Sequence, residues 1–183
     1  MNEADLTEKR LSSRVIAKIG PFEYCLDRVL LPNGEEKEKS LVKHPGAVAV
    51  LAINDRREIA MVRQYRYAVG RFLDEIPAGK LDKIPGETPL EGAYRELREE
   101  TGMIADRVVP IGKIYPSPGI ITEELNLFFA DGLTQSCQEL DDDEFINVEW
   151  WPIERLEESM LDGSMVDAKT ICAYQIARTK GLI

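Results

Sequence analysis

Three glutamates near the end of one amphipathic segment, Glu96, Glu99 and Glu100, have the spacing and the chemistry of a cation site. Their i, i+3 and i+4 spacing places them on one strip of an α-helix. Acidic side chains near a helix C-terminus oppose the helix dipole, and like charges at this spacing repel one another. A bound divalent cation would offset both effects, and ligation by oxygen alone favours Mg²⁺ or Mn²⁺. The spacing therefore predicts a metal site on this helix.

The helix that must position these acids has recognisable ends in the sequence. Thr88 is a suitable N-cap, Pro89 suits the first helical position, and Glu91 completes a capping box. Gly102 provides the C-terminal stop. The periodicity places one apolar stripe toward the core, formed by Leu90, Ala93, Tyr94 and Leu97. The alternative interpretation is an ordinary amphipathic helix whose acidic face is only solvated.

A longer pattern around this helix favours the metal site. Glu87 is followed, after seven residues, by Arg95-Glu96-Leu97-Arg98-Glu99-Glu100-Thr101-Gly102-Met103. From Glu87 onward this resembles, at every specified position, the Nudix box of nucleoside-diphosphate-linked pyrophosphohydrolases, G-x5-E-x7-R-E-U-x-E-E-x-G-U with U aliphatic. The first glycine of the pattern is not matched: Leu81 stands at its position, and Gly79 lies eight residues before Glu87. We interpret this departure as a two-residue insertion within Asp82 to Pro85.

Four further segments are similar to the ADP-ribose pyrophosphatase branch of the Nudix family. They are Arg63-Gln64-Tyr65-Arg66, Glu75-Ile76-Pro77-Ala78-Gly79-Lys80, Tyr115-Pro116-Ser117-Pro118-Gly119 and Asp142-Asp143-Glu144-Phe145. The resemblance covers roughly Pro45 to the C-terminus, with a weaker match before it. It implies an enzyme that uses Mg²⁺ or Mn²⁺ to hydrolyse ADP-ribose to AMP and ribose 5-phosphate. The alternatives are hydrolysis of another nucleoside diphosphate sugar, such as GDP-mannose, and a non-catalytic domain that senses a nucleotide.

The resemblance also implies roles for individual residues. The implied metal ligands are Glu96, Glu100, Glu99 and the backbone carbonyl of Ala78. The implied catalytic residues are Glu144, Glu99, Arg95 and Glu87. Among these, Glu87 and Arg95 would form an ion pair that holds the box loop on its helix. Glu144 would be the general base, and the alternative for it is one acid of a solvated loop.

Candidate substrate contacts lie outside the box. Arg63, Arg66 and Lys80 stand where the resemblance places the cleft, and they would bind the phosphates and ribose. An arginine at the end of a strand is commonly a surface charge, which is the alternative for each. Pro118 lies fifteen residues after Met103, where the branch has a proline, and the alternative for its segment is an ordinary turn.

The resemblance further implies a homodimer. In this branch the N-terminal sheet exchanges between subunits and contributes to the partner's site. Phe22 and Tyr24 in that sheet would then contact the adenine. The alternative is that both aromatic side chains belong to the core of a small sheet.

Composition restricts the partners and the compartment. The net charge of −10 disfavours nucleic-acid polymers as partners. The N-terminal segment 1–14 is charged, and no apolar run has the length of a membrane span, so neither a secretory signal nor a membrane anchor is expected. Three cysteines without metal-ligand spacing suit reduced thiols in a cytoplasmic protein. His44 is the sole histidine, which argues against a zinc site.

The remaining pattern predicts an α/β fold with a mixed sheet between helices, preceded by a small antiparallel sheet. Expected strands are 14–19, 22–31, 37–42, 47–53, 59–63, 108–115, 125–130 and 145–151, and expected closing helices are 153–161 and 168–180. The Nudix resemblance implies the same α/β/α sandwich. We expect residues 1–44 to form the N-terminal sheet, a dimerisation element, and residues 45–183 to form the hydrolase domain.

Overall fold

The chain divides into two units in the computed structural model, which describes residues 6–142 and 144–183. The first unit is Met1–Gly46 with Tyr115–Glu124, and the second is Ala47–Ile114 with Leu125–Ile183. The sequence analysis places residues 115–124 in the hydrolase domain, whereas in the structure they belong to the N-terminal unit. Asp143, one acid of the expected acidic loop, lies outside the described residues, as do residues 1–5.

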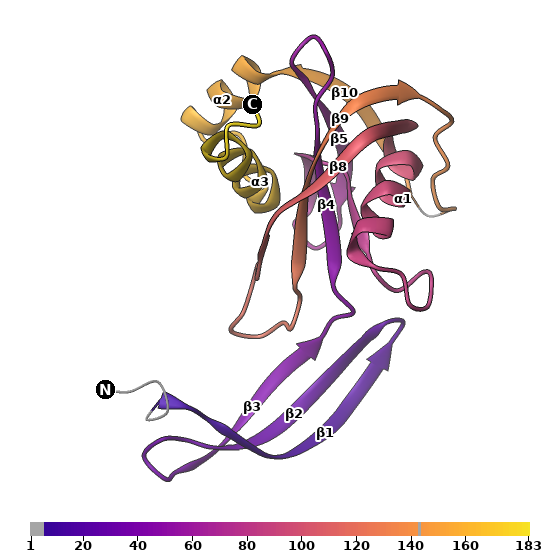
Figure 1. Cartoon of the computed structure of the whole chain (residues 1–183). Helices are drawn as coiled ribbons and strands as arrows, with labels where there is room; N and C mark the ends of the chain where they lie inside the picture. The colour runs from indigo at the N-terminus through magenta and orange to yellow at the C-terminus, as the bar shows by residue number, and fades with distance from the viewer. Residues whose placement is uncertain (1–5, 143) are drawn as a thin grey trace. The chain divides into compact units, whose positions relative to one another are not determined.

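The first unit is an antiparallel sheet of three strands in the order β1-β2-β3 (Figure 1). Its strands are β1 Lys9–Ile19, β2 Phe22–Leu30 and β3 Glu36–Lys43. Val42 of β3 exchanges backbone hydrogen bonds of 2.8 and 3.0 Å with Ile120 and Thr122, which ties the 115–124 segment to this sheet. Strand β1 begins five residues earlier than the periodicity predicts and is exposed along its whole length.

The second unit contains a mixed sheet and a smaller antiparallel one. The mixed sheet has the order β7-β4-β9-β8, in which β4 and β9 are parallel. Its strands are β4 Ala47–Ala52, β7 Ala78–Lys80, β8 Met103–Ile114 and β9 Leu125–Gln135. The smaller sheet has the order β10-β5-β6, with β5 Glu58–Arg66, β6 Arg71–Glu75 and β10 Asn147–Pro152. The sequence predicts neither β6 nor β7, and it predicts one sheet where the unit has two.

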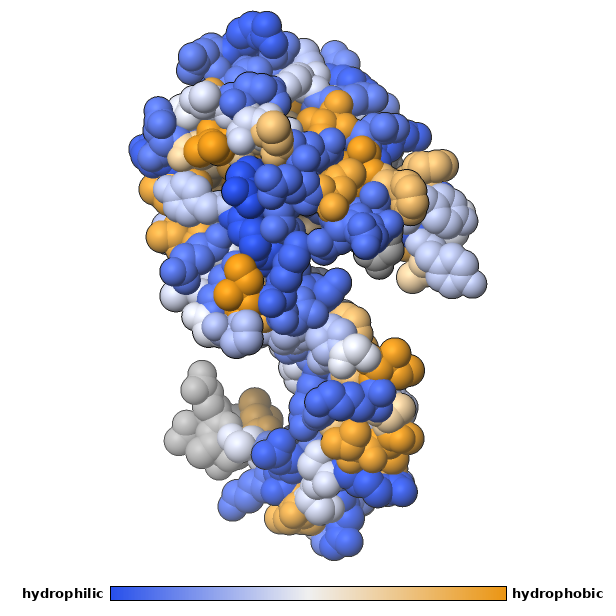
Figure 2. Space-filling view, turned by 90° about the vertical axis from the view of Figure 1, so that its right-hand side faces the viewer, coloured by the Kyte–Doolittle hydropathy of each residue, from blue (hydrophilic) through white to orange (hydrophobic). Residues whose placement is uncertain are grey.

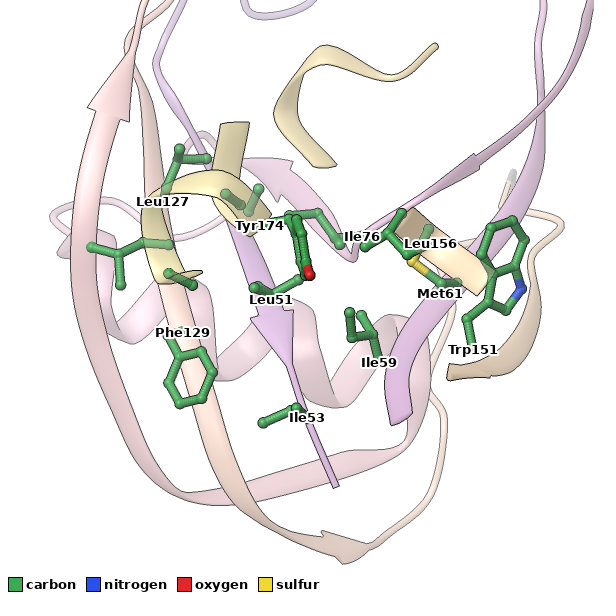
Figure 3. Close-up of a cluster of buried hydrophobic side chains, with 14 of the residues drawn as sticks. Leu51, Ile53, Ile59, Met61, Ile76, Leu127, Phe129, Trp151, Leu156 and Tyr174 are labelled. Carbon is green, nitrogen blue, oxygen red and sulfur yellow. The ribbon is translucent and has the colours of Figure 1, made fainter. Parts of the chain in front are cut away.

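Helices cover both faces of the mixed sheet, so the predicted α/β/α sandwich is confirmed. Figure 1 shows α1 (Pro89–Thr101) on one side of β4, and α2 (Ile153–Leu161) and α3 (Ala168–Thr179) on the other. Alternate side chains of a strand point to opposite faces. Leu51 of β4 packs in the cluster beneath α2 and α3, with Leu156 and Tyr174 (Figure 3). Val50 packs against Leu97 of α1. A strand buried on both faces explains the continuous apolar sequence of β4.

No helix within the described ranges is long and apolar enough to cross a membrane.

Candidate active site

Helix α1 begins and ends where the sequence predicts. Thr88 caps it in a complete capping box with Glu91, and Gly102 ends it in the left-handed conformation at φ 69°. The predicted apolar stripe is half wrong: Ala93 and Leu97 are fully buried, whereas Leu90 and Tyr94 are 42% and 38% exposed. The buried face turns instead toward Glu96 and Glu100. The helix therefore directs two acids, rather than two large apolar side chains, toward the sheet.

Glu96 lies directly against the backbone of β7. A Cβ atom at Gly79 would stand 1.9 Å from Glu96 Oε1, so a glycine is needed there to leave room for the carboxylate. The same oxygen accepts a hydrogen bond from Arg95 Nη1 at 2.6 Å. Burial raises the pKa of Glu96; Arg95 opposes this effect, and the negative charges of Glu99 and Glu144 add to it.

Glu100 is the most enclosed acid of the site, with 2% of its surface exposed. Its Oε2 accepts a hydrogen bond from the N–H of Ala78 at 2.9 Å. Burial raises the pKa of Glu100 to about 8; the Ala78 bond and Lys169 oppose the shift, and Glu96 and Glu144 add to it. Three carboxylates therefore lie within electrostatic range of one another, which a divalent cation would stabilise.

Arg95 connects three of the box acids. Its Nε and Nη2 donate to the two oxygens of Glu87 at 2.7 and 2.8 Å, and both side chains are almost fully buried. Its Nη1 donates to Glu96 at 2.6 Å and to Glu99 at 3.0 Å. The bonds to Glu87 raise the pKa of Arg95 above its usual value. The ion pair expected between Glu87 and Arg95 is present, and its role in holding the box loop stays a prediction.

Glu144 reaches the site on a segment bonded to the C-terminal end of α1. Gln138 Nε2 donates to the carbonyl of Glu100 at 2.6 Å, and the N–H of Glu139 donates to the carbonyl of Glu99 at 3.0 Å. Further along, Glu144 closes a turn with Asp141: its N–H donates to the Asp141 carbonyl at 2.9 Å, and its carboxylate accepts the Asp141 N–H at 3.2 Å. The turn places a half-buried carboxylate near the box acids.

Lys83 bridges this turn to the box helix. Its ammonium donates to Glu99 Oε2 at 3.1 Å and to Asp141 Oδ1 at 2.6 Å. These bonds, with Asp141 first, raise the pKa of Lys83. Lys83 stands within Asp82 to Pro85, the segment that we interpret as carrying an insertion, and the family pattern does not predict its contacts.

The basic candidates for substrate contacts are held by neighbouring groups. One nitrogen of Arg63, Nη1, donates to both carboxylate oxygens of Asp74 in β6, at 2.9 and 2.8 Å. Arg66 donates to both oxygens of Glu75, at 2.7 and 2.6 Å. The Lys80 side chain is exposed, and its carbonyl accepts a 3.3 Å hydrogen bond from the box-helix arginine. All three residues lie in the unit that carries the box.

A second charged network, which the sequence analysis misses, surrounds Glu75, three residues before Ala78. Glu75 is 1% exposed and accepts hydrogen bonds from Lys169 as well as from Arg66. Burial alone would raise the pKa of Glu75, but the bonds to these two cations lower it below its usual value. Lys169 also donates to Asp167 at 3.0 Å. Glu75 is the first residue of the segment 75–80, which is similar to the ADP-ribose pyrophosphatase branch. That similarity was the one sequence signal that could have pointed to Glu75.

The remaining substrate candidates belong to the first unit. Phe22 lies 5.2 Å from the His44 ring, centroid to centroid, and Tyr24 is 42% exposed. Pro118 is exposed in a turn closed by hydrogen bonds from Ile120 and Ile121 to the Ser117 carbonyl. Their contacts with a substrate stay predictions.

The donor set fits Mg²⁺ or Mn²⁺, because the acids that surround Glu100 offer only oxygen. Within residues 6–142 and 144–183, no three acidic, histidine or cysteine side chains converge closely enough to hold an ion as they stand. Glu96 and Glu99 are instead turned toward Arg95. The mutual repulsion of the buried acids is the feature that a cation would relieve.

Comparisons with known proteins agree with this geometry. The model of the family described as NUDIX domain matches residues 43–174. An ADP-ribose pyrophosphatase from Bacillus subtilis is 40% identical over 177 residues, 96% of this chain and 95% of that protein. A methanol dehydrogenase activator from Bacillus methanolicus is 37% identical over 92% of this chain and 88% of that protein. The crystal structure of an ADP compounds hydrolase superimposes with a TM-score of 0.82 over 97% of each chain, at 22% identity, which supports the fold alone.

Proposed function

The chain belongs to the NUDIX domain family, and from this premise we propose that it hydrolyses the pyrophosphate bond of ADP-ribose to AMP and ribose 5-phosphate. The observation that carries the proposal is the pair of buried carboxylates, Glu96 and Glu100, on a helix that matches the Nudix box from Glu87 onward, with Glu144 close enough to raise the pKa of both. The relative named ADP-ribose pyrophosphatase, which this chain matches over nearly its whole length, supports the choice of substrate.

Glu96 and Glu100 would hold a divalent cation, with Glu99 and the carbonyl of Ala78 as further ligands. When bound, Mg²⁺ or Mn²⁺ would neutralise charge on the pyrophosphate oxygens and on the leaving phosphate. Helix α1 would hold the glutamate ligands in place, because its caps fix where the helix starts and ends and because Ala93 and Leu97 pack on the sheet.

Glu144 would act as the general base. A water molecule adds to one phosphorus, the bridging P–O bond breaks, and the proton of the water goes to the Glu144 carboxylate. Arg95 and Glu87 contribute by orientation: their buried bidentate pair joins the start of the box to its helix.

Arg63, Arg66 and Lys80 would bind the phosphates and ribose, and Pro118 would line the substrate site. Both arginines are held by β6 carboxylates, which limits their rotamers before the substrate binds. Phe22 and Tyr24 would contact the adenine across a homodimer.

Features of the N-terminal sheet support the homodimer. Strand β1 is an edge strand of eleven residues, exposed throughout, and edges of this kind pair readily with another chain. The exposed apolar side chains along this strand are Leu11, Val15, Ile16 and Ile19. Figure 2 shows apolar surface over this unit. The neighbouring Asp27 is buried, and its Oδ1 has no partner among the residues that the structure describes.

A cytoplasmic location is part of the same proposal. Cys25, Cys137 and Cys172 are all free thiols, as a reducing compartment keeps them.

The test is a substrate panel. The purified protein is incubated with ADP-ribose, GDP-mannose and NADH, each with Mg²⁺ and with excess chelator, and the products are resolved by chromatography. We expect AMP to form from ADP-ribose with Mg²⁺ and not with excess chelator. Preferential cleavage of GDP-mannose would move the substrate and keep the site, whereas cleavage of none by folded protein would favour a nucleotide-sensing domain.

The Bacillus methanolicus relative supports a second candidate function, activation of methanol dehydrogenase. It is tested by adding this chain to that dehydrogenase and measuring the rate of methanol oxidation. An unchanged rate would leave hydrolysis as the function.

A further inference from the structure

The first turn of α3 is bonded to the segment that precedes Ala78. Asp167 caps this helix, and its Oδ2 accepts hydrogen bonds from the Thr170 N–H at 3.0 Å and from the Thr170 hydroxyl at 2.5 Å. Because the hydroxyl gives its hydrogen to Asp167, its oxygen remains free to accept another hydrogen bond. It accepts the N–H of Ile76 at 2.9 Å. Thr170 is fully buried, so water cannot substitute for this bond.

Lys169 holds the residue next to Ile76. Its ammonium donates to the buried carboxylate of Glu75, which also accepts two hydrogen bonds from Arg66. Glu75 and Asp167 carry two negative charges, and Lys169 and Arg66 carry two positive ones, so the network is neutral. Charge-assisted bonds in a site with little water are strong and directional. Glu75 is therefore fixed in place from two sides.

The backbone of Ile76 and Pro77 connects these hydrogen bonds to the N–H of Ala78, which contacts Glu100. The carbonyl of Pro77 accepts the N–H of Val50 at 2.9 Å, and the next N–H, that of Ala78, donates to Glu100. The ring of Pro77 restricts the backbone between Ile76 and Ala78. The position of the Ala78 N–H, and with it the orientation of the Glu100 carboxylate, thus depends on how the preceding segment is held.

We propose that Thr170 and Lys169 are positioning residues of the active site, which hold the Glu75–Ala78 segment so that Ala78 orients Glu100 toward the metal. The inference rests on the proposed function of Glu100 as a metal ligand. A buried ion pair is by itself weak evidence for a stabilising role, because replacing both partners by apolar side chains is commonly neutral or stabilising. Groups that orient a metal ligand, in contrast, change metal affinity or activity by about 10- to 100-fold.

The test compares two substitutions of Thr170. Thr170→Val keeps the shape and removes the acceptor for Ile76, whereas Thr170→Ser keeps the hydroxyl. We expect the Mn²⁺ dissociation constant, measured by electron paramagnetic resonance, to rise about tenfold in Thr170→Val and to stay within about twofold in Thr170→Ser. For ADP-ribose, kcat should fall about tenfold in Thr170→Val with KM within about threefold. Thr179→Val is the control, because its exposed hydroxyl donates to the Gln175 carbonyl of the same helix, at 2.8 Å.

Thermal unfolding separates positioning from stability. A lower Tm with wild-type Mn²⁺ affinity and wild-type kcat would overturn the proposal, because it is the result of a purely structural role. If Thr170→Val does not fold, Lys169→Met serves in its place, with an expected loss in kcat of about tenfold at unchanged KM. Wild-type kcat in that variant would also overturn the proposal. Failure of the proposed function is distinct: the wild type would leave ADP-ribose intact, while the Mn²⁺ measurements would still test positioning.

Discussion

The carboxylate of Glu96 lies against the backbone of Gly79, with no room for a Cβ atom between them. This contact joins β7 to α1 and places a buried acid beside Ala78. The segment 82–85, which we interpret as carrying a two-residue insertion, follows Gly79 in the chain. From the contact with Glu96 we infer that Gly79 takes the place of the first glycine of the box, although its sequence spacing differs.

Gly79→Ala should disable the site and spare the fold. The added methyl group would overlap Glu96 Oε1, which is the far end of a flexible side chain and can move away. We expect a Tm close to that of the wild type and a Mn²⁺ dissociation constant raised by at least about tenfold. Gly112→Ala is the matched control, because its Cβ would make an ordinary 3.6 Å contact with Ile176. Unchanged Mn²⁺ affinity in Gly79→Ala would contradict the assignment of Glu96 as a ligand.

Glu100 should give the metal-free protein a stability that decreases as the pH rises. Its pKa in the folded protein is about 8, above the ordinary value of 4.5, so the folded state binds this proton more tightly than the unfolded state. The stabilisation is fully present below pH 4.5 and is lost as the pH rises through about 8. Tm measured in chelator should fall across this range, and Glu100→Gln should flatten the decrease. An equal decrease in both proteins would show that another group is responsible.

Glu144→Gln tests the general base. The amide cannot accept the proton of the attacking water, but it has the same size as the carboxylate. We expect kcat for ADP-ribose to fall by about 10²- to 10⁴-fold while KM changes little. Modest and parallel losses in kcat and in substrate binding would mean that Glu144 lies at the periphery of the site.

Arg95→Met should destabilise the fold strongly. It would leave Glu87, a carboxylate with 3% of its side chain exposed, without its bidentate partner. Removing one partner of a buried pair costs about 3–5 kcal/mol, measurable by denaturant unfolding. The control on the same helix is Arg98→Met, whose pair with Glu139 is exposed and worth about 1 kcal/mol or less. Equal losses in the two variants would contradict the buried role of Arg95.

Local sequence signals predicted α1 well and the rest of the site unevenly. The caps of α1 depend on residues within one turn, which is why Thr88 and Gly102 were found. Helical periodicity alone could not tell which angular sector the sheets cover, and it therefore placed Leu90 and Tyr94 in the core. The exposed position of both follows from the closeness of β7, which admits Glu96 instead.

Short strands and long-range pairs were beyond sequence reasoning. Strands β6 and β7 have five and three residues, too few for a period to emerge. The bond between Glu75 and Lys169 joins residues 94 positions apart, and no local pattern connects them. The contact of Lys83 with Asp141 likewise depends on how two loops fold over the end of α1.

The most direct test of the account is AMP formation from ADP-ribose by the wild type and by Glu100→Gln, each with Mg²⁺ and with excess chelator. We expect AMP from the wild type with Mg²⁺, none with chelator, and a loss of at least about 10²-fold in Glu100→Gln, with circular dichroism showing that the variant is folded. Chelator-resistant turnover, or near-normal turnover in folded Glu100→Gln, would contradict it.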